Sequence, residues 1–119
     1  MYNKPKEYHK LYTQHYGIKI NKSKQNRHIA GHKTLKSTSS YFDNDVETLQ
    51  KVLDEKAGTC DIIITKGRLL EVIQDNRLNG RDYSFKTQAF TKTNMAKIHY
   101  SKTGHHIVPY FDYSEDDKK

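Results

Sequence analysis

The fold is decided by residues 97–110, which read Lys97-Ile98-His99-Tyr100-Ser101-Lys102-Thr103-Gly104-His105-His106-Ile107-Val108-Pro109-Tyr110. Thr103-Gly104 is predicted to form a two-residue hairpin turn, because glycine adopts the positive φ that such turns need. This turn pairs Ser101 with His106 and His99 with Val108 across two antiparallel strands. The stretch is therefore expected to be the hairpin around which the rest of the chain folds.

Side chains alternate between the two faces of a strand, so this hairpin has one apolar face and one polar face. The apolar face is expected to lie on the core and carries Ile98, Tyr100 and Ile107. The polar face carries Lys97, His99, Ser101 and His106. The pattern predicts a row of proton-handling groups on an accessible sheet surface.

The chain of 119 residues has the length of one domain with a single core. Only 34% of the residues are hydrophobic and Trp is absent, so the nine Tyr are expected to supply part of that core. No apolar run approaches the ~20 residues of a membrane helix, and the polar start shows no signal-peptide pattern. We expect no membrane partner. The lone Cys60 excludes an internal disulfide and a thiolate metal cluster, and is expected to be a buried structural thiol.

The net charge of +7 is concentrated in the first third of the chain. Residues 1–42 contain nine Lys or Arg and one acid, whereas residues 43–110 contain ten bases and nine acids. A positive field confined in this way predicts a polyanionic partner such as RNA. The alternative is a solvated charged surface that binds nothing in particular.

Two segments show helical periodicity. The first covers residues 2–16 and is expected to end at Gly17, and its tyrosine stripe favours packing on the domain over base stacking. The second covers residues 44–56, where Asn44 resembles an N-cap and an apolar stripe follows. Residues 21–26 are expected to be a polar, lysine-rich loop.

Strand signals follow the second helix. Residues 61–65 are a β-branched run, and residues 68–73 are ambiguous between a strand and a helical turn. Asn79-Gly80 predicts a hairpin turn before residues 83–90, in which apolar and polar side chains alternate. The order predicts an α+β fold, with N-terminal helices packed on one face of a small twisted antiparallel sheet.

Histidine, lysine and hydroxyl groups are the ones that metal-free RNA cleavage uses. A base takes the 2′-hydroxyl proton, the oxygen attacks the adjacent phosphorus, an acid protonates the leaving 5′ oxygen, and a cation stabilises the pentavalent intermediate. Histidine suits both proton roles because its pKa lies near neutrality. The alternative is structural: His99 and Ser101 are then only the polar face of an edge hairpin, and His106 is bonded to Ser101.

Metal chemistry is disfavoured by the sequence. A two-metal nuclease needs several converging carboxylates, and the basic histidine segments contain none. His28 and His32 have the spacing of two zinc ligands on a helix, but Gly31 lies between them and no carboxylate is near. We therefore expect neither a metal nor another cofactor.

Residues 98–109 resemble the terminal signature of the polymorphic toxin type 50 domain, which reads Ile-His-Tyr-Ser-Lys, a variable residue, Gly, another variable residue, then His-Ile-Val-Pro. Residues 24–31, Lys-Gln-Asn-Arg-His-Ile-Ala-Gly, are similar to the family's basic-His-x-x-Gly motif. Ala57-Gly58-Thr59 is similar to its Ala-Gly-Thr-Gly, with Cys60 where the family usually has Gly. The motifs occur in the family's order from about Ile18 to Pro109.

The resemblance implies a predicted RNase toxin of the barnase/EndoU/colicin/RelE-like fold. It marks His28, His99, Ser101 and His106 as the positions of a catalytic site. We expect His28 to be one proton-transfer residue and His99 or His106 to be the other, while Ser101 binds phosphate or orients His106. The RNA backbone is expected to contact Arg27, Lys33, Lys36, Lys97 and Lys102.

The predicted function is a metal-independent endoribonuclease toxin acting on tRNA or mRNA in the cytoplasm of a target bacterium. Such a toxin is delivered as the C-terminal part of a larger secreted or phage protein and has an acidic immunity protein as partner. We divide the chain into an N-terminal helical segment 1–17, a toxin-like domain 18–110 and an acidic, disordered tail 111–119. One alternative is a non-catalytic nucleic-acid-binding or phage structural module of the same fold. Another is a zinc hydrolase using His28, His32 and His106.

Overall fold

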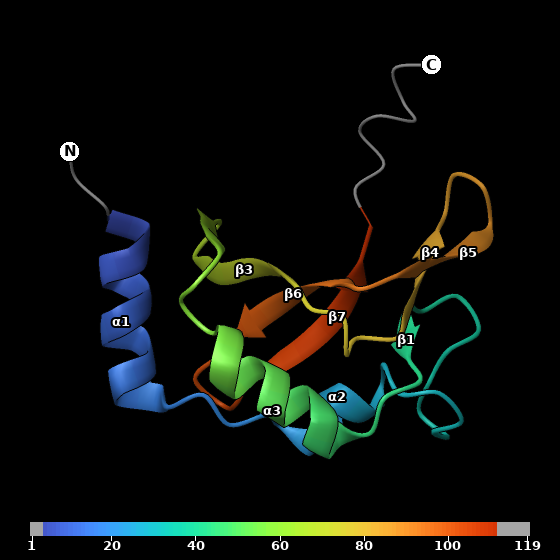
Figure 1. Ribbon diagram of the computed structural model, residues 1–119, viewed down its shortest axis with the longest axis horizontal. Helices are drawn as coiled ribbons and strands as arrows, with labels where there is room; N and C mark the ends of the chain where they lie inside the picture. The colour runs from blue at the N-terminus through green and yellow to red at the C-terminus, as the bar shows by residue number, and fades with distance from the viewer. Residues whose placement is uncertain (1–3, 112–119) are drawn as a thin grey trace.

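The computed structural model describes residues 4–111. Within them the elements follow the order α1 (Lys4–Tyr16), α2 (Lys22–Asn26), β1 (Tyr41–Phe42), α3 (Val46–Lys56), β2 (Asp61–Thr65), β3 (Arg68–Gln74), β4 (Gly80–Ser84), β5 (Ala89–Thr93), β6 (Met95–Tyr100) and β7 (His106–Tyr110) (Figure 1). The strands form two antiparallel sheets, one of order β1-β4-β5 and one of order β2-β3-β6-β7. The α+β class is confirmed.

The core lies between α3 and one face of the four-stranded sheet. The apolar stripe of α3 buries Leu49, Val52 and Leu53 completely. The sheet contributes its own buried side chains Leu69, Ile73, Ala96, Ile98, Tyr100 and Ile107. Burial of a side chain of this size contributes ~2 kcal/mol to the stability of the fold. This face of β6 and β7 is therefore committed to the core, and the opposite face is the one available for a functional site.

The β6–β7 hairpin has the predicted faces but not the predicted register. His99 pairs with His106 and Ile98 with Ile107, so the predicted pairing of Ser101 with His106 is wrong. The connection spans residues 101–105 instead of two residues. The error in pairing is an even number of residues, and side chains alternate with period two, so the side chains within the two strands stay on their predicted faces.

The longer connection exists because His105 turns into the protein. Its ring is fully buried. Its Nδ1 accepts the Ser101 amide hydrogen at 2.9 Å, so its Nε2 carries the proton and donates to the Gly17 carbonyl at 2.7 Å. Its backbone bridges Ile20 in parallel fashion. These bonds stop the β-ladder at His106.

Helix α1 is confirmed over its described residues and ends at Gly17, whose φ is +74°. It stands beside β2 at one edge of the four-stranded sheet (Figure 1). No helix among the described residues is long and apolar enough to cross a membrane. Residues 1–3 and 112–119, which include all but one residue of the predicted tail, lie outside the described part of the chain.

Helix boundaries differ from prediction at two places. Residues 22–26, predicted as a loop, form α2, because the Asn21 side chain caps the helix by accepting the Lys24 amide hydrogen at 3.1 Å. The N-cap of α3 is Asp45 and not Asn44. Asn44 instead bonds to the backbone of the loop before β4, which removes it from the cap.

The strand predictions are confirmed in part. Residues 61–65 form β2, and the ambiguous stretch after it is β3. Asn79-Gly80 is not a hairpin turn between β3 and β4, because β4 pairs with β1 and β5 in the other sheet. The alternating stretch 83–90 is interrupted by the β4–β5 turn. Cys60 is half-buried at the rim of the core.

Candidate active site

Three imidazole rings stack on the sheet face that points away from the core. His106 is in the middle, with its ring centroid 4.8 Å from that of His99 and 5.7 Å from that of His28. The planes are nearly parallel, at 17° and 10° respectively. His99 on β6 and His106 on β7 meet because they are paired across the hairpin. The structure thus brings together the three predicted histidines.

His28 reaches the stack because Gln25 fastens α2 to the edge of β7. The buried Gln25 amide accepts the Ile107 amide hydrogen at 2.7 Å and donates to the Ile107 carbonyl at 2.9 Å, as a neighbouring strand would. The His28 ring is then held by a 2.9 Å contact between its Nδ1 and the Ser40 carbonyl. Gln25 has no signal in the sequence, where it is one polar residue in a lysine-rich run.

All three imidazoles have lowered pKa values. Burial lowers the pKa of His28, and Arg27 adds to the effect. Burial also lowers the pKa of His99, with further lowering by His28, Lys97 and Arg68.

The pKa of His106 is lowest, at about 3, because burial is reinforced by His99, His28, Lys24 and Arg27. The charged groups that shift the three values are all basic, and within residues 4–111 no carboxylate is among them. The stack is therefore neutral at pH 7 and surrounded by positive charge.

Ser101 lies in the β6–β7 connection and does not orient His106. Its hydroxyl accepts a hydrogen bond from Lys24 Nζ at 3.0 Å and lies 3.2 Å from Thr103 Oγ1. Lys24 Nζ also donates to Thr103 Oγ1 at 2.7 Å. This cluster of one ammonium and two hydroxyls remains consistent with the predicted phosphate contact. Lys24 was missed by sequence reasoning because nothing local distinguishes it from the other lysines.

The predicted cations divide into two groups. Lys97 shares a strand with His99, and its Nζ lies 4.5 Å from the centre of the Tyr110 ring. Arg27 and Lys97 lower pKa values of histidines in the stack, and Lys102 lines a pocket onto which His99 and His106 open. Lys33 and Lys36 are exposed on the loop before β1, and neither lines that pocket nor shifts the pKa of the three histidines.

His99 and His106 open into a pocket of about 420 Å³. The other residues that line it are Tyr12, Gly67, Arg68, Leu70, Tyr100, Ser101 and Lys102. Arg68 and Tyr12 were not predicted as site residues. No residue of this lining is acidic, so the pocket suits an anionic ligand.

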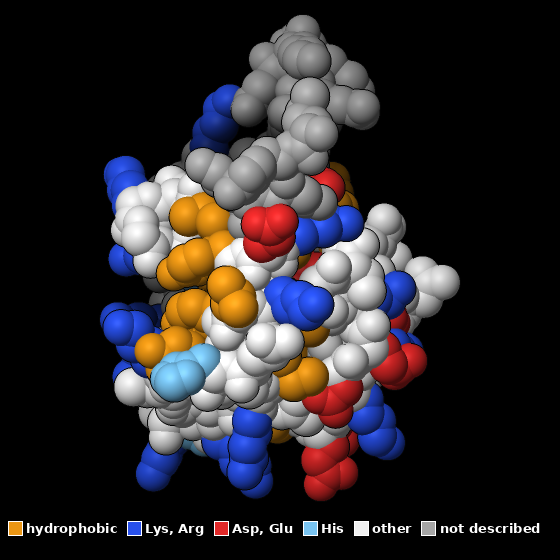
Figure 2. Space-filling view, turned by 90° about the vertical axis from the view of Figure 1, so that its left-hand side faces the viewer, with side chains coloured by type: hydrophobic (Ala, Val, Ile, Leu, Met, Phe, Trp, Pro, Cys, Tyr) orange, Lys and Arg blue, Asp and Glu red, His pale blue; other side chains and the backbone are white. Residues whose placement is uncertain are grey.

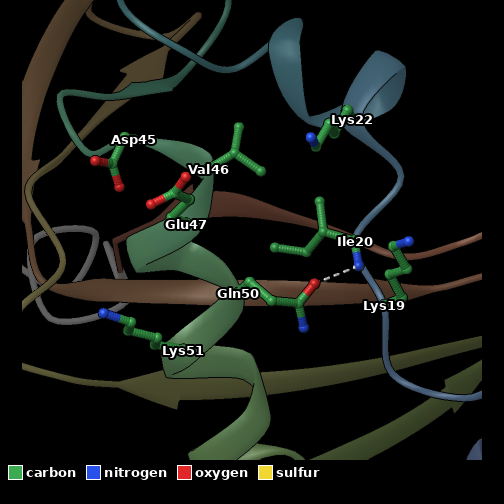
Figure 3. A pocket seen from close by; sticks show the side chains of 8 residues that line it. All are labelled: Lys19, Ile20, Lys22, Asp45, Val46, Glu47, Gln50 and Lys51. Carbon is green, nitrogen blue, oxygen red and sulfur yellow. Dashed lines mark hydrogen bonds between the residues drawn. The ribbon is translucent and has the colours of Figure 1, made fainter.

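A larger pocket of about 650 Å³ lies between α3 and the segment before α2 (Figure 3). It mixes lysines with Asp45 and Glu47, and Gln50 spans it by accepting the Ile20 amide hydrogen at 2.7 Å. It contains no histidine, so the reactive groups place the candidate site at the smaller pocket.

A metal site has no support in this arrangement of side chains. Within residues 4–111 no group of three or more His, Cys, Asp or Glu side chains is placed to hold a metal ion. His32 lies apart from the stack, with its Nδ1 2.8 Å from the Thr34 hydroxyl.

The comparisons with known proteins agree with the motifs of the sequence. The family model described as bacterial toxin 50 matches residues 20–109, which include α2, α3, the strands β1 to β7 except Tyr110, and the three stacked histidines. Helix α1 lies outside the match. No curated protein and no solved structure matches the chain. Because the family model covers most of its length, the chain belongs to the bacterial toxin 50 family.

Proposed function

We propose that this toxin is an endoribonuclease that cleaves RNA through its own 2′-hydroxyl, without a metal ion. The observation that carries the proposal is the stack of His28, His106 and His99, neutral at pH 7 and surrounded by cations. Neutral imidazoles accept protons, and the surrounding charge attracts a polyanion. The substrate class is RNA of the target bacterium, tRNA or mRNA.

The reaction requires one imidazole as base and another as acid. A bound phosphodiester places negative charge beside the stack and raises the pKa of each ring, while repulsion between neighbouring imidazolium ions opposes a second protonation. One ring is then protonated while another stays neutral, as acid–base catalysis needs. His106 has the lowest pKa, so we assign proton transfer to the outer rings, His28 and His99.

The bond changes follow from these roles. The neutral ring removes the 2′-hydroxyl proton as that oxygen bonds to phosphorus, and the protonated ring gives its proton to the 5′ oxygen as its bond to phosphorus breaks. Lys97 and the Lys24 cluster stabilise the negative charge on the phosphorane. The products are a 2′,3′-cyclic phosphate and a free 5′-hydroxyl. DNA lacks the attacking hydroxyl and stays intact.

The test is cleavage of total bacterial RNA by the purified chain in the presence of EDTA. His28→Ala and His99→Ala should each reduce the rate by ~10²–10⁴, the usual contribution of a general acid or base. His32→Ala is the matched control and should cleave at the wild-type rate, because His32 bonds only within its own loop.

Each other result contradicts the proposal in a different way. RNA that is bound but never cleaved, together with normal growth of expressing cells, identifies the non-catalytic module. Cleavage that stops with EDTA and returns with zinc identifies the metal hydrolase.

Membership in a toxin family implies a cognate immunity protein. We propose that this partner is acidic and covers the basic surface around the stack, since charge complementarity speeds association. We also propose that the domain acts in the cytoplasm of the target bacterium after delivery as the C-terminal part of a larger secreted or phage protein.

A further inference from the structure

Tyr12 of α1 borders the same pocket as His99 and His106, although α1 lies outside the residues that the family model matches. We infer that Tyr12 is the residue on which a nucleobase stacks next to the cleaved phosphate. The inference rests on the proposed function and names a substrate-positioning contact for it. Helix α1 is then one wall of the substrate site as well as a packing element.

The position of Tyr12 is fixed by buried contacts one turn earlier in the helix. His9 is buried, its ring meets Tyr100 edge-on with 4.7 Å between centroids, and its Nε2 lies 3.5 Å from Glu71 Oε1. Glu71 is itself fully buried and accepts hydrogen bonds from the Tyr100 hydroxyl at 2.7 Å and the Gly58 amide at 2.8 Å. These contacts hold α1 in place, so the Tyr12 ring is positioned before a ligand binds.

The Tyr12 ring suits stacking because it is half-buried and neutral. It packs against the core, and its centroid lies 4.8 Å from that of Tyr16, 5.9 Å from that of Tyr8 and 6.4 Å from that of His105. Burial and the neighbouring Tyr8 and Tyr16 raise the pKa of its phenol, so it carries no negative charge to repel phosphate. Single-stranded RNA is recognised by aromatic rings that take up splayed bases.

The other residues that line the pocket provide the positive charge and apolar surface that a nucleotide site needs. Arg68 and Lys102 bring positive charge to the lining, and Leu70 and Tyr100 supply apolar surface. An aromatic ring, cations and two imidazoles in one pocket are a combination that can hold a base and its phosphate together. The histidines would then contact the phosphodiester that joins this nucleotide to its neighbour.

Other large apolar residues of α1 are exposed outside the pocket and can be compared with Tyr12. Figure 2 shows apolar side chains gathered in a stripe on the side of the molecule where α1 stands, with Lys and Arg around it. Tyr8, Leu11 and Tyr16 are exposed on α1, at 45%, 66% and 37%, and none of them lines the pocket. A change in KM on substitution of Tyr12 alone therefore indicates stacking in the site. A similar change on substitution of the exposed residues of α1 indicates non-specific binding of RNA to the helix.

The experiment measures kcat and KM of the full chain on a short single-stranded RNA. Tyr12→Leu keeps an apolar contact with the core but removes the ring, and should raise KM about tenfold while kcat changes little. Tyr12→Phe keeps the ring and should restore the wild-type KM. Leu11→Ala, at an exposed position on the same helix, is the control and should not change KM. A KM unchanged in Tyr12→Leu overturns this inference and leaves the proposed function standing.

A second measurement needs no change at Tyr12. RNA containing 5-bromouridine, irradiated with the His99→Ala chain, should cross-link to Tyr12, located by fragmentation of the tryptic peptide 11–19, which also contains Tyr16. Cross-links confined to other peptides contradict the inference even if Tyr12→Leu fails to fold. A wild-type chain that neither binds nor cleaves RNA overturns the proposed function and this inference with it.

Discussion

Protonation of His106 is expected to destabilise the fold. The pKa of His106 is held at about 3 by burial and by the basic groups around it, against 6.5 for an unperturbed histidine. Since the folded pKa is the lower one, the unfolded chain takes up the proton first as the pH falls. Stability from this group is complete above pH 6.5 and is lost as the pH falls toward 3. The pKa difference corresponds to at most ~5 kcal/mol, which partial exposure of the ring reduces to ~2 kcal/mol.

The measurement is the free energy of unfolding in urea at about pH 7.5 and about pH 4 for the wild type and His106→Gln. The wild type should lose ~1.4 kcal/mol more than the variant over this range, because pH 4 is still above the folded pKa and the other histidines are common to both. The NMR titration of the His106 ring gives the pKa directly. A midpoint near that of a free histidine, or equal losses in the two proteins, refutes the account of the stack as a desolvated, neutral cluster.

Three further changes test how the site is held. Gln25→Leu removes two buried hydrogen bonds and should lower the free energy of unfolding in urea by ~2–3 kcal/mol, whereas the exposed Gln14→Leu should change it by less than ~0.5 kcal/mol. Gly104→Ala should lower the free energy of unfolding by ~2 kcal/mol or more, because φ is +110° and the new Cβ would lie 2.8 Å from Asn21 Cβ. Gly31→Ala, in open space at φ +76°, should lower it by only ~1 kcal/mol. Equal losses would show that the contact with Asn21 is unimportant. Lys24→Met should reduce the salt dependence of RNA affinity by ~0.7–0.9 in the slope of log K against log salt, and an unchanged slope would remove Lys24 from the phosphate site.

The faces of the final hairpin were predictable from the sequence, but its register was not. Alternation alone assigns His99 and His106 to one side and Ile98 and Ile107 to the other. The register depends on where the ladder stops, and here it stops because His105 finds buried partners at Gly17 and Ser101. The contact with Gly17 joins residues far apart in the chain, so a local turn signal could not anticipate where the ladder stops.

The histidine stack was predictable as a set of residues but not as an arrangement. His28 was identified by its motif, whereas its position depends on Gln25, which completes the edge of β7. A polar side chain that makes the hydrogen bonds of a neighbouring strand leaves no pattern in the sequence. The same holds for Lys24, whose hydrogen bonds reach the β6–β7 connection.

The division into two sheets also escaped prediction. Asn79-Gly80 is a strong local turn signal, yet β4 pairs with β1 and β5 and not with β3. Gly80 is needed there for a different reason, because a Cβ at this position would lie 3.0 Å from Pro109. Close packing between the sheets, and not a hairpin, accounts for this glycine.

The proposed cleavage by the imidazole stack uses the 2′-hydroxyl as its nucleophile. It is tested by the mass of the 5′ fragment from an RNA oligonucleotide incubated with the chain and EDTA, beside the same oligonucleotide with 2′-O-methyl groups. We expect a 2′,3′-cyclic phosphate end from the first and no cleavage of the second. Cleavage of the methylated RNA, or fragments that end in a 3′-hydroxyl, would contradict it.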